Sequence, residues 1–122
     1  MSTAAALAPS DADRIFIAMG DATRRAIFRL LSQGPQPVSA LARALDITLT
    51  GVAQHLEVLQ SCRLVQTRKT GRVRLCAVDP QGLAVLDEWI AMNKRMWEAR
   101  FDRLDAVLDE VPAHAGETSA GR

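Results

Sequence analysis

The sequence predicts a mainly α-helical fold with a small β-hairpin: a winged helix-turn-helix of about five helices and a two-stranded wing that forms a homodimer. Three observations carry this prediction. Two short amphipathic segments joined by a tight bend at Asp46 and Ile47 are typical of a helix-turn-helix. Apolar and polar residues alternate on both sides of Gly71, which indicates a hairpin, here called the wing (residues 64–78). A long apolar stripe after Pro80 indicates an extended last helix.

Length and composition fit one soluble globular domain. Of 122 residues, 48% are hydrophobic and 24% are charged. We expect a flexible N-terminus at residues 1–10, a domain at residues 11–111 that includes the last helix at residues 80–111, and a flexible tail at residues 112–122. Two cysteines are too few for a disulfide-bonded secreted scaffold, and neither a signal peptide nor a membrane-spanning segment is evident. These features predict a cytoplasmic protein with no membrane partner.

Helix-capping residues predict where each helix begins, because their side-chain oxygens can accept the free N–H groups of a first turn. The expected caps are Ser10 or Asp11, Asp21, Ser39, Thr48 and Asp79. Pro112 is expected to end the last helix. The hairpin is expected to pair residues 64–68 with residues 72–78 across a turn at Thr70 and Gly71. Apolar residues at helical spacing are expected to face one core: Ile27, Leu30, Leu31, Leu41, Leu45, Val52, Leu56 and Leu59.

Charge is unevenly distributed along the chain. Residues 22–78 hold nine Arg or Lys side chains and only two acids, Asp46 and Glu57. Residues 79–122 hold five basic and nine acidic side chains. A solvated charged surface would mix acids among its bases, so the basic middle of a nearly neutral chain favours a polyanion-binding surface.

The second helix of the helix-turn-helix, at residues 48–61, is predicted to be the recognition helix that enters the major groove of DNA. Gln54 can read an adenine edge, and Thr50 can meet a thymine methyl group or a phosphate. His55 is expected to contact the DNA backbone or fix the helix end, with a packed histidine as the alternative. Basic wing residues are expected to neutralise phosphates. The predicted DNA-binding residues are Thr48, Thr50, Gln54, His55, Arg68, Lys69, Arg72 and Arg74.

The last helix is predicted to pair two copies of the chain, because its apolar stripe is longer than one small domain needs for its own core. Asn93 interrupts the stripe, and it either sets the register of the dimer or lies at the solvated edge of the seam. A two-fold dimer would place two recognition helices about one turn of DNA apart on a palindrome. The predicted interface residues are Leu86, Ile90, Asn93, Trp97, Phe101, Leu104 and Leu108.

Four motifs link the chain to a known family. They are GDATRRAI at residues 20–27, LARAL at residues 41–45, VAQHLEVL at residues 52–59, and GRVR at residues 71–74 followed by Asp79 and Pro80. Together they resemble the ArsR/SmtB family of bacterial winged-helix repressors over about residues 12–108. The resemblance implies a homodimer, paired through its first and last helices, that blocks a promoter until a signal weakens its hold on DNA.

The metal sites of that family do not carry over to this sequence. Residues 39–46 contain no cysteine of the kind found in arsenic and cadmium sensors, and residues 79–111 contain no histidine of the kind found in zinc and nickel sensors. The last helix resembles instead the non-metal branch, through MWEARFDRL at residues 96–104. We therefore expect no metal site and no cofactor. Gly51 and Ala53 stand where many relatives carry serine or a bulkier residue, so base contacts by the middle of the recognition helix stay open.

Two alternatives to a plain repressor remain open. Cys62 and Cys76 could act as a thiol-based redox or metalloid sensor within the same fold, although lone cysteines are commonly small core residues. The domain could also be a winged helix used as a protein-interaction module, with the wing as its docking patch. No phosphate loop, nucleophile motif or carboxylate pair predicts an enzyme, and neither the effector nor the operator can be inferred from the sequence.

Overall fold

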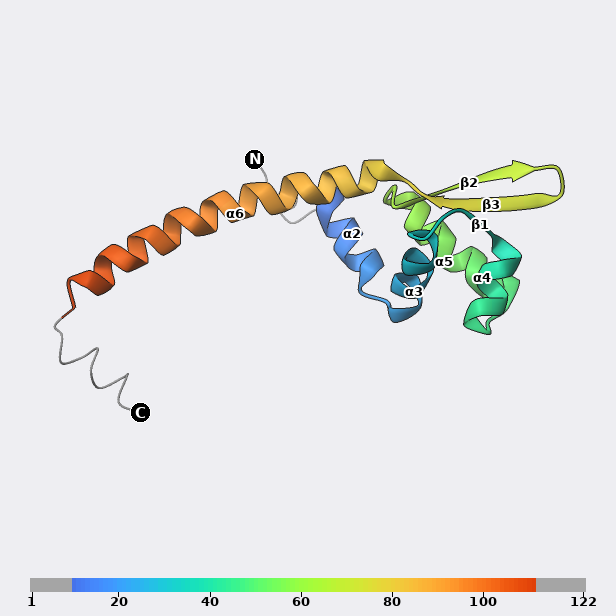
Figure 1. Ribbon diagram of the computed structural model, residues 1–122, viewed down its shortest axis with the longest axis horizontal. Coiled ribbons are helices and arrows are strands. Elements are labelled where there is room, and N and C mark those ends of the chain that lie inside the picture. Colours follow the sequence, from blue (N-terminus) through green and yellow to red (C-terminus); the bar gives the residue numbers. More distant parts are fainter. Residues whose placement is uncertain (1–9, 112–122) are drawn as a thin grey trace, which may run out of the picture. The chain divides into compact units, whose positions relative to one another are not determined.

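A computed structural model describes residues 10–111, and the expected flexible segments, apart from Ser10, lie outside that range. Within these described residues, five helices and three strands follow one another as α2 (Asp11–Met19), α3 (Ala22–Leu31), β1 (Gln36–Pro37), α4 (Val38–Leu45), α5 (Leu49–Ser61), β2 (Val65–Thr70), β3 (Val73–Val78) and α6 (Pro80–Asp109) (Figure 1). The winged helix-turn-helix predicted from the sequence is confirmed. No helix within residues 10–111 is both long enough and apolar enough to cross a membrane.

Helix α5 lies at the centre of the core. Its side chains Val52, Leu56 and Leu59 are at most 1% exposed, and they pack with buried residues from α2, α3, α4 and the sheet. Burying one such side chain stabilises a fold by about 1.5–3 kcal/mol. The predicted core stripe is confirmed, with Leu30 and Leu45 only half-buried at its edge.

Side-chain caps begin both α2 and α3, and polar contacts join the end of the first helix to the start of the second. Ser10 caps α2, and its hydroxyl oxygen accepts the N–H of Asp13 at 3.1 Å while Asp13 accepts the N–H of Ser10 at 2.9 Å. The Asp21 carboxylate caps α3 by accepting the N–H of Arg24 at 2.9 Å. This hydrogen bond is the main cause that holds the pKa of Asp21 below its usual value. Arg24 in turn donates to the carbonyl of Ala18 at 2.6 Å, near the C-terminal end of α2.

The sheet and α4 differ from the prediction in two details. Pro37 precedes α4 and offers no side-chain cap, so Ser39 lies inside the helix and does not cap it. Gln36 and Pro37 also form a third strand that pairs with β3, giving the order β1-β3-β2. A two-residue strand that contains a proline has no alternating pattern, which is why the sequence predicted only the two strands of the wing.

The wing is a tight hairpin. Residues 71 and 72 form its loop between the paired residues Thr70 and Val73, and Gly71 has the positive φ of 63° that the turn requires. The predicted turn was placed one residue early, and β2 extends two residues beyond its predicted end. Because cross-strand partners share a face, this register decides where each basic wing residue points.

The chain divides into two compact units within α6, after Asp87. In the first unit, the start of α6 contacts the turn between α5 and β2: the N–H of Gly82 donates to the carbonyl of Arg63 at 2.8 Å. A Cβ atom at position 82 would lie 2.5 Å from that carbonyl oxygen. Glycine is therefore required at this position by close approach. In the second unit, α6 ends at Asp109, two residues before the predicted end.

We predict that Gly82→Ala lowers the free energy of unfolding by about 1–3 kcal/mol, because the added methyl group overlaps the Arg63 peptide. The sign is diagnostic, since alanine normally stabilises a helix relative to glycine by up to about 1 kcal/mol. Urea denaturation measures the change, with Ala84→Gly in the same helix as the control for helix propensity. A more stable Gly82→Ala variant would contradict the close approach.

We also predict an acid-sensitive contribution from Asp21. Its folded-state pKa is lowered, so its stabilising effect is complete above the unfolded pKa of about 3.9 and is lost as the pH falls through the folded value. Asp21→Asn keeps a capping oxygen but cannot titrate. The variant should therefore lose less stability than the parent when urea denaturation is repeated between neutral pH and about pH 3. Parallel pH curves for the two proteins would refute this assignment.

Candidate nucleic-acid interface

The outer face of α5 is polar and free of core contacts. Thr50 and Gln54 are exposed, whereas Val52 and Leu56 point into the core. Thr48 caps the helix, because its hydroxyl oxygen accepts the N–H of Gly51 at 2.9 Å. The Thr48 hydroxyl hydrogen stays available as a donor at the same end of the helix. These three side chains lie where the sequence predicted them.

A hydrogen-bond network that the sequence did not predict joins α5 to the wing. Gln60 of α5 donates through Nε2 to the Thr67 hydroxyl oxygen at 2.7 Å. Arg74 of β3 donates to the same oxygen through Nε and Nη2, each at 3.3 Å. Thr67 thus fixes both the recognition helix and one basic wing side chain. These contacts depend on register and on packing between distant segments, and neither is visible in a local sequence pattern.

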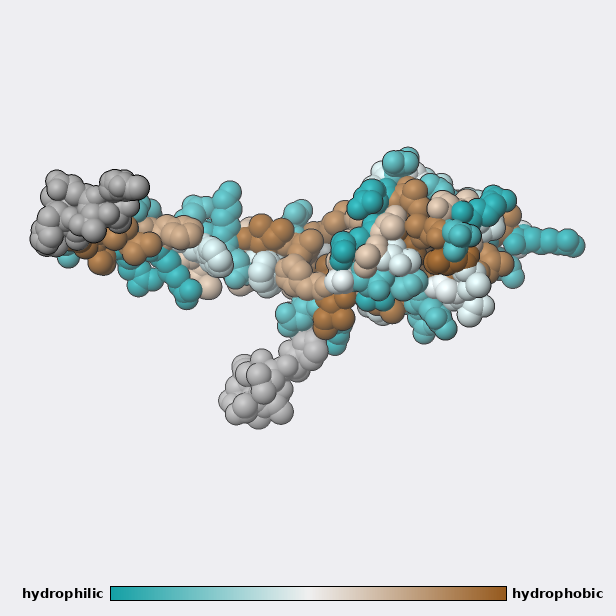
Figure 2. All heavy atoms as spheres, turned by 90° about the horizontal axis from the view of Figure 1, so that it is seen from below, coloured by the Kyte–Doolittle hydropathy of each residue, from teal (hydrophilic) through white to brown (hydrophobic). Residues whose placement is uncertain are grey.

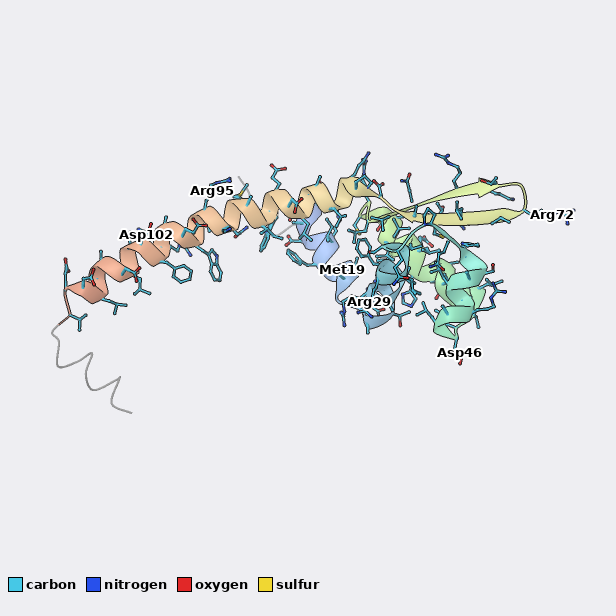
Figure 3. All side chains as sticks on the ribbon, in the orientation of Figure 1. Met19, Arg29, Asp46, Arg72, Arg95 and Asp102 are labelled. Carbon is cyan, nitrogen blue, oxygen red and sulfur yellow. The ribbon has the colours of Figure 1, made fainter. Side chains whose placement is uncertain are left out.

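The register divides the predicted basic residues of the wing between two faces. Lys69 pairs with Arg74, on the face that also carries Thr67 and the buried Cys76. Arg68 pairs with Leu75 on the opposite face. Arg72 lies in the loop at the tip of the hairpin (Figure 3). All four are exposed, so they remain candidates for phosphate contacts, but only Lys69 and Arg74 share the face bonded to α5.

A surface depression of about 440 Å³ lies between the wing and the helix-turn-helix. Arg72 and Arg74 line one side, and Ser39, Leu49 and Ala53 line the other. Two of the four predicted wing cations, Arg72 and Arg74, therefore border the same depression as the start of the recognition helix. Leu49 was not predicted as part of this surface, although its side chain is 58% exposed at the first position of α5. No sequence signal marks Leu49 as exposed, because its spacing from Val52 and Leu56 fits the buried stripe of the helix.

His55 packs against the junction of α2 and α3. Its Nδ1 lies 3.5 Å from Arg24 Nη1 and 3.8 Å from Asp21 Oδ2. Because arginine only donates, Nδ1 accepts from Arg24 in the neutral tautomer that carries its proton on Nε2. His55 thus holds the middle of α5 against the start of α3, and its contact with DNA remains a prediction.

Part of the basic middle of the sequence has a structural use. Arg24 and Arg25 donate to the carbonyls of Ala18 and Met19 at 2.6 and 2.8 Å, where a positive charge suits the C-terminal end of α2. Arg63 donates to Gln81 at 2.6 Å. The charge count alone therefore overstated the surface available to a polyanion.

The two cysteines are unsuited to reactive chemistry. Cys76 is fully buried in the core and Cys62 is half-buried, and burial raises the pKa of both thiols. Neither forms a disulfide. Within residues 10–111, no group of three His, Cys, Asp or Glu side chains is placed to hold a metal ion.

The second unit presents an exposed apolar stripe on α6. Trp97, Phe101, Leu104 and Leu108 are each about half exposed, and apolar side chains recur along this segment in Figure 2. The rings of Trp97 and Phe101 pack edge to face with centroids 6.0 Å apart. The predicted interface residues Ile90 and Asn93 belong to the same stripe, and Asn93 donates to the carbonyl of Trp89 at 2.8 Å. Leu86, in the first unit, packs at the edge of the core.

Comparison with known proteins identifies the relatives of this chain. A family model described as a helix-turn-helix domain matches residues 19–68. The HTH-type transcriptional regulator Rv2034 of Mycobacterium tuberculosis is 47% identical over 74 residues, which cover 61% of this chain and 69% of that protein.

Two solved structures show the same fold. The ArsR family transcriptional regulator RHA00566 is 36% identical with a TM-score of 0.67, over 75% of this chain and 94% of that one. The ArsR-like transcriptional regulator from Rhodococcus sp. RHA1 is 26% identical with a TM-score of 0.73, over 83% and 95% of the two chains. With its helix-turn-helix, its wing and these relatives, the chain belongs to the ArsR family of winged helix-turn-helix transcriptional regulators.

Proposed function

We propose that this regulator is a cytoplasmic, homodimeric repressor that binds a palindromic operator and is released by a signal. The observation that carries the proposal is the shared surface between α5 and the wing, where Arg72 and Arg74 border the start of the recognition helix. A protein that blocks a promoter needs base contacts for sequence specificity and phosphate contacts for affinity. This surface supplies candidates for both.

The base contacts are assigned to Gln54 and Thr50, which are exposed on the outer face of α5. Glutamine can bind the N6 and N7 edge of adenine in the major groove, and threonine can contact a thymine methyl group. Thr48, at the cap, and His55, through Nε2, are assigned to flanking phosphates. The exposed Leu49 suits an apolar contact with a sugar or a thymine methyl group.

The phosphate contacts are assigned mainly to Lys69, Arg72 and Arg74. Lys69 and Arg74 share the wing face that is bonded to α5, and Arg72 is at the tip. Arg68 lies on the other face of the wing and is assigned a smaller share. Each neutralised phosphate releases counterions, so binding should weaken steeply as salt rises.

Dimerisation is assigned to the apolar stripe of α6. Contiguous apolar surface on a soluble protein marks an interaction site, whereas scattered apolar residues are ordinary. Four large side chains of this stripe are about half exposed in the isolated chain. This is the exposure expected of the apolar interface of a helix pair when the second helix is absent. A two-fold pair would make the preferred operator a palindrome.

The thiol-sensor alternative receives no support from the two cysteines. A redox sensor needs an accessible thiol of low pKa, and both pKa values are raised here.

Selecting bound fragments from genomic DNA, then measuring their affinity at several salt concentrations, separates a repressor from a protein-docking module. Recovery of a palindromic site with steep salt dependence is expected, and failure to enrich any sequence would overturn the proposal.

Replacing Arg72 and Arg74 together by alanine should weaken binding to every DNA sequence. The slope of log affinity against log salt should fall in magnitude by about 1–2, since each phosphate contact contributes about 0.9. Fluorescence anisotropy across a salt series measures the slope. Arg68→Ala tests the face assignment and should cost less, and Arg100→Ala in the second unit controls for the loss of charge. An unchanged slope in the double variant would refute the wing assignment.

Replacing Gln54 by alanine should relax sequence choice and leave the salt slope intact. The loss should amount to about 1–3 kcal/mol of discrimination at one base pair in each half-site. Competition binding with operators mutated at single positions locates that base pair. Equal discrimination by the parent and the variant would show that Gln54 does not read a base.

Leu104→Arg should convert the dimer to a monomer, because a charge would be buried in an apolar seam. Asp102→Arg is the control, because Asp102 does not belong to the apolar stripe and lies with Arg95 on one side of the helix (Figure 3). Sedimentation velocity should give monomers for the first variant and dimers for the second. Intact dimers in Leu104→Arg would contradict the interface.

A further inference from the structure

Thr67 is a half-buried residue of the wing that is not among the residues assigned to DNA contacts. We propose that it is a positioning residue for DNA binding: its hydroxyl oxygen holds the Arg74 guanidinium in the orientation that receives a backbone phosphate. The DNA half of this inference rests on the proposed repressor function. The ordering of Arg74 by Thr67 rests on the structure of the wing alone.

The hydroxyl oxygen of Thr67 accepts hydrogen bonds from two elements. Gln60 of α5 donates through Nε2 at 2.7 Å, and Arg74 of β3 donates through Nε and Nη2 at 3.3 Å each. Thr67 pairs with Cys76, which is two residues from Arg74 along β3. A diagonal neighbour of this kind is within reach of a long side chain. The Arg74 side chain therefore lies back along the wing, from the register of Lys69 toward that of Thr67.

Arg74 needs such a contact because its direct cross-strand neighbour is also a cation. Lys69 lies opposite Arg74 on the same face of the wing, and like charges at directly opposite positions repel each other. Within residues 10–111, neither side chain takes part in an ion pair. Without Thr67, the long Arg74 side chain would be free to turn away from Lys69. With Thr67, two positive charges stay close together, and an anion that contacts both would stabilise them.

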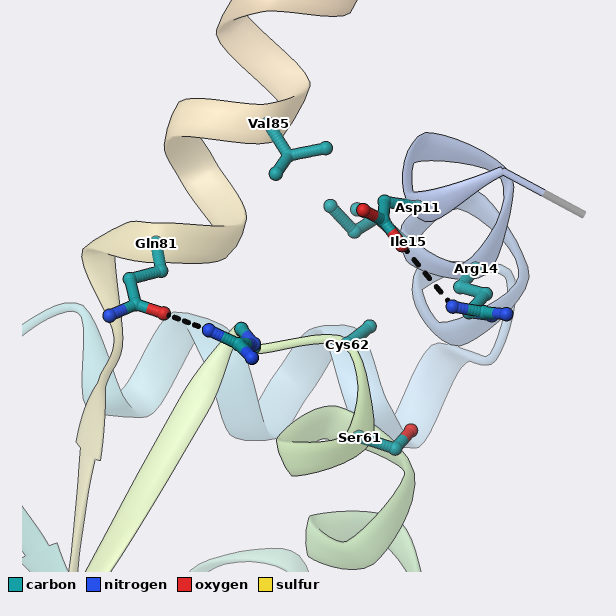
Figure 4. Close-up of a pocket in the computed structure, with 8 residues that line it drawn as sticks. Asp11, Arg14, Ile15, Ser61, Cys62, Gln81 and Val85 are labelled. Atoms are coloured by element: carbon teal, nitrogen blue, oxygen red, sulfur yellow. Dashed lines mark hydrogen bonds and ion pairs between the residues drawn. The ribbon is translucent and has the colours of Figure 1, made fainter.

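The Thr67 hydroxyl orients Arg74 without offsetting its charge. Arg14 of α2 shows the contrast, because it is paired with the Asp11 carboxylate at 3.2 Å (Figure 4). Thr67 engages only two of the five N–H groups of the Arg74 guanidinium, one on Nε and one on Nη2. The three that remain are at the end of the side chain. From there they can donate two parallel, charge-assisted hydrogen bonds to phosphate oxygens.

Holding Arg74 before DNA arrives lowers the cost of binding. A flexible arginine loses rotamer freedom when a ligand fixes it, and that loss weakens the complex. An Arg74 that is already fixed does not incur this cost at the binding step. Because Gln60 ties the same oxygen to α5, Arg74 is also held at a set position relative to the recognition helix. Thr67 thus contributes to affinity for every DNA sequence and not to the choice of sequence.

Relaxation of the ¹⁵N nuclei in the arginine Nε–H groups tests the positioning in the free protein. The Arg74 side chain should be ordered, whereas Arg68, on the opposite face of the wing, should be mobile. Thr67→Val removes the hydroxyl and keeps the shape, so it should raise the mobility of Arg74 to that of Arg68. Thr67→Ser keeps the oxygen and should retain the order. Equal mobility of Arg74 and Arg68 in the parent protein would overturn the positioning.

A double-mutant cycle on the genomic fragment that the protein selects tests the DNA half. Thr67→Val should weaken binding about two- to tenfold, the effect expected when one flexible side chain is ordered only on binding. Thr67→Ser should restore most of that affinity. In an Arg74→Ala background, Thr67→Val should have no further effect, because the side chain that it positions is absent. A loss that persists in this background would show that Thr67 only holds the wing against α5, and it would overturn the inference.

Circular dichroism checks that each variant folds. If Thr67→Val unfolds, Arg74→Lys decides the matter, because position 74 is exposed and lysine keeps the charge but not the forked donors. Arg74→Lys should weaken binding about two- to tenfold with an unchanged salt slope, and affinity equal to that of the parent would overturn the inference. A protein that selects no DNA fragment would refute the proposed repressor and the DNA half together, whereas the ordering of Arg74 in the free protein would stand.

Discussion

The burial of one face of α5 is the constraint on which the rest of the structure depends. Val52, Leu56 and Leu59 are inserted into a core built from α2, α3, α4 and the sheet, and at most 1% of each remains exposed. A helix with one face held this tightly has no freedom to rotate about its axis. Its opposite face, with Thr50 and Gln54, is therefore presented in a fixed orientation. A recognition helix needs this fixed orientation to place side chains on base edges.

Polar contacts then position the basic residues for different tasks. Thr67 links Gln60 of α5 to Arg74 of the wing, so the two elements to which we assign the DNA contacts are held together. Arg24, by contrast, binds a carbonyl at the end of α2 and approaches His55. Arginines that are indistinguishable by charge thus differ in use: Arg24 holds α2 and α3 together, whereas Arg74 is exposed and keeps N–H donors for a polyanion. The second unit carries the exposed apolar stripe that we propose as the surface for a partner copy.

Much of this architecture could be predicted because it follows from local patterns in the sequence. The stripe at Val52, Leu56 and Leu59, the caps at Asp21 and Thr48, and the positive φ of Gly71 each follow from a few neighbouring residues. The third strand, the bond between Gln60 and Thr67, and the close approach of Gly82 to Arg63 could not be predicted. They depend on which distant segments meet.

The most direct test of the central claim maps the DNA contacts on the protein. Backbone amide shifts of the ¹⁵N-labelled full chain can be followed during titration with the genomic fragment that the protein selects. The structure predicts the largest changes at residues 48–54 and 69–74, the two elements that border the shared surface. Changes confined to other parts of the chain, with the amides of residues 48–54 unmoved, would contradict the assignment of α5 as the recognition helix.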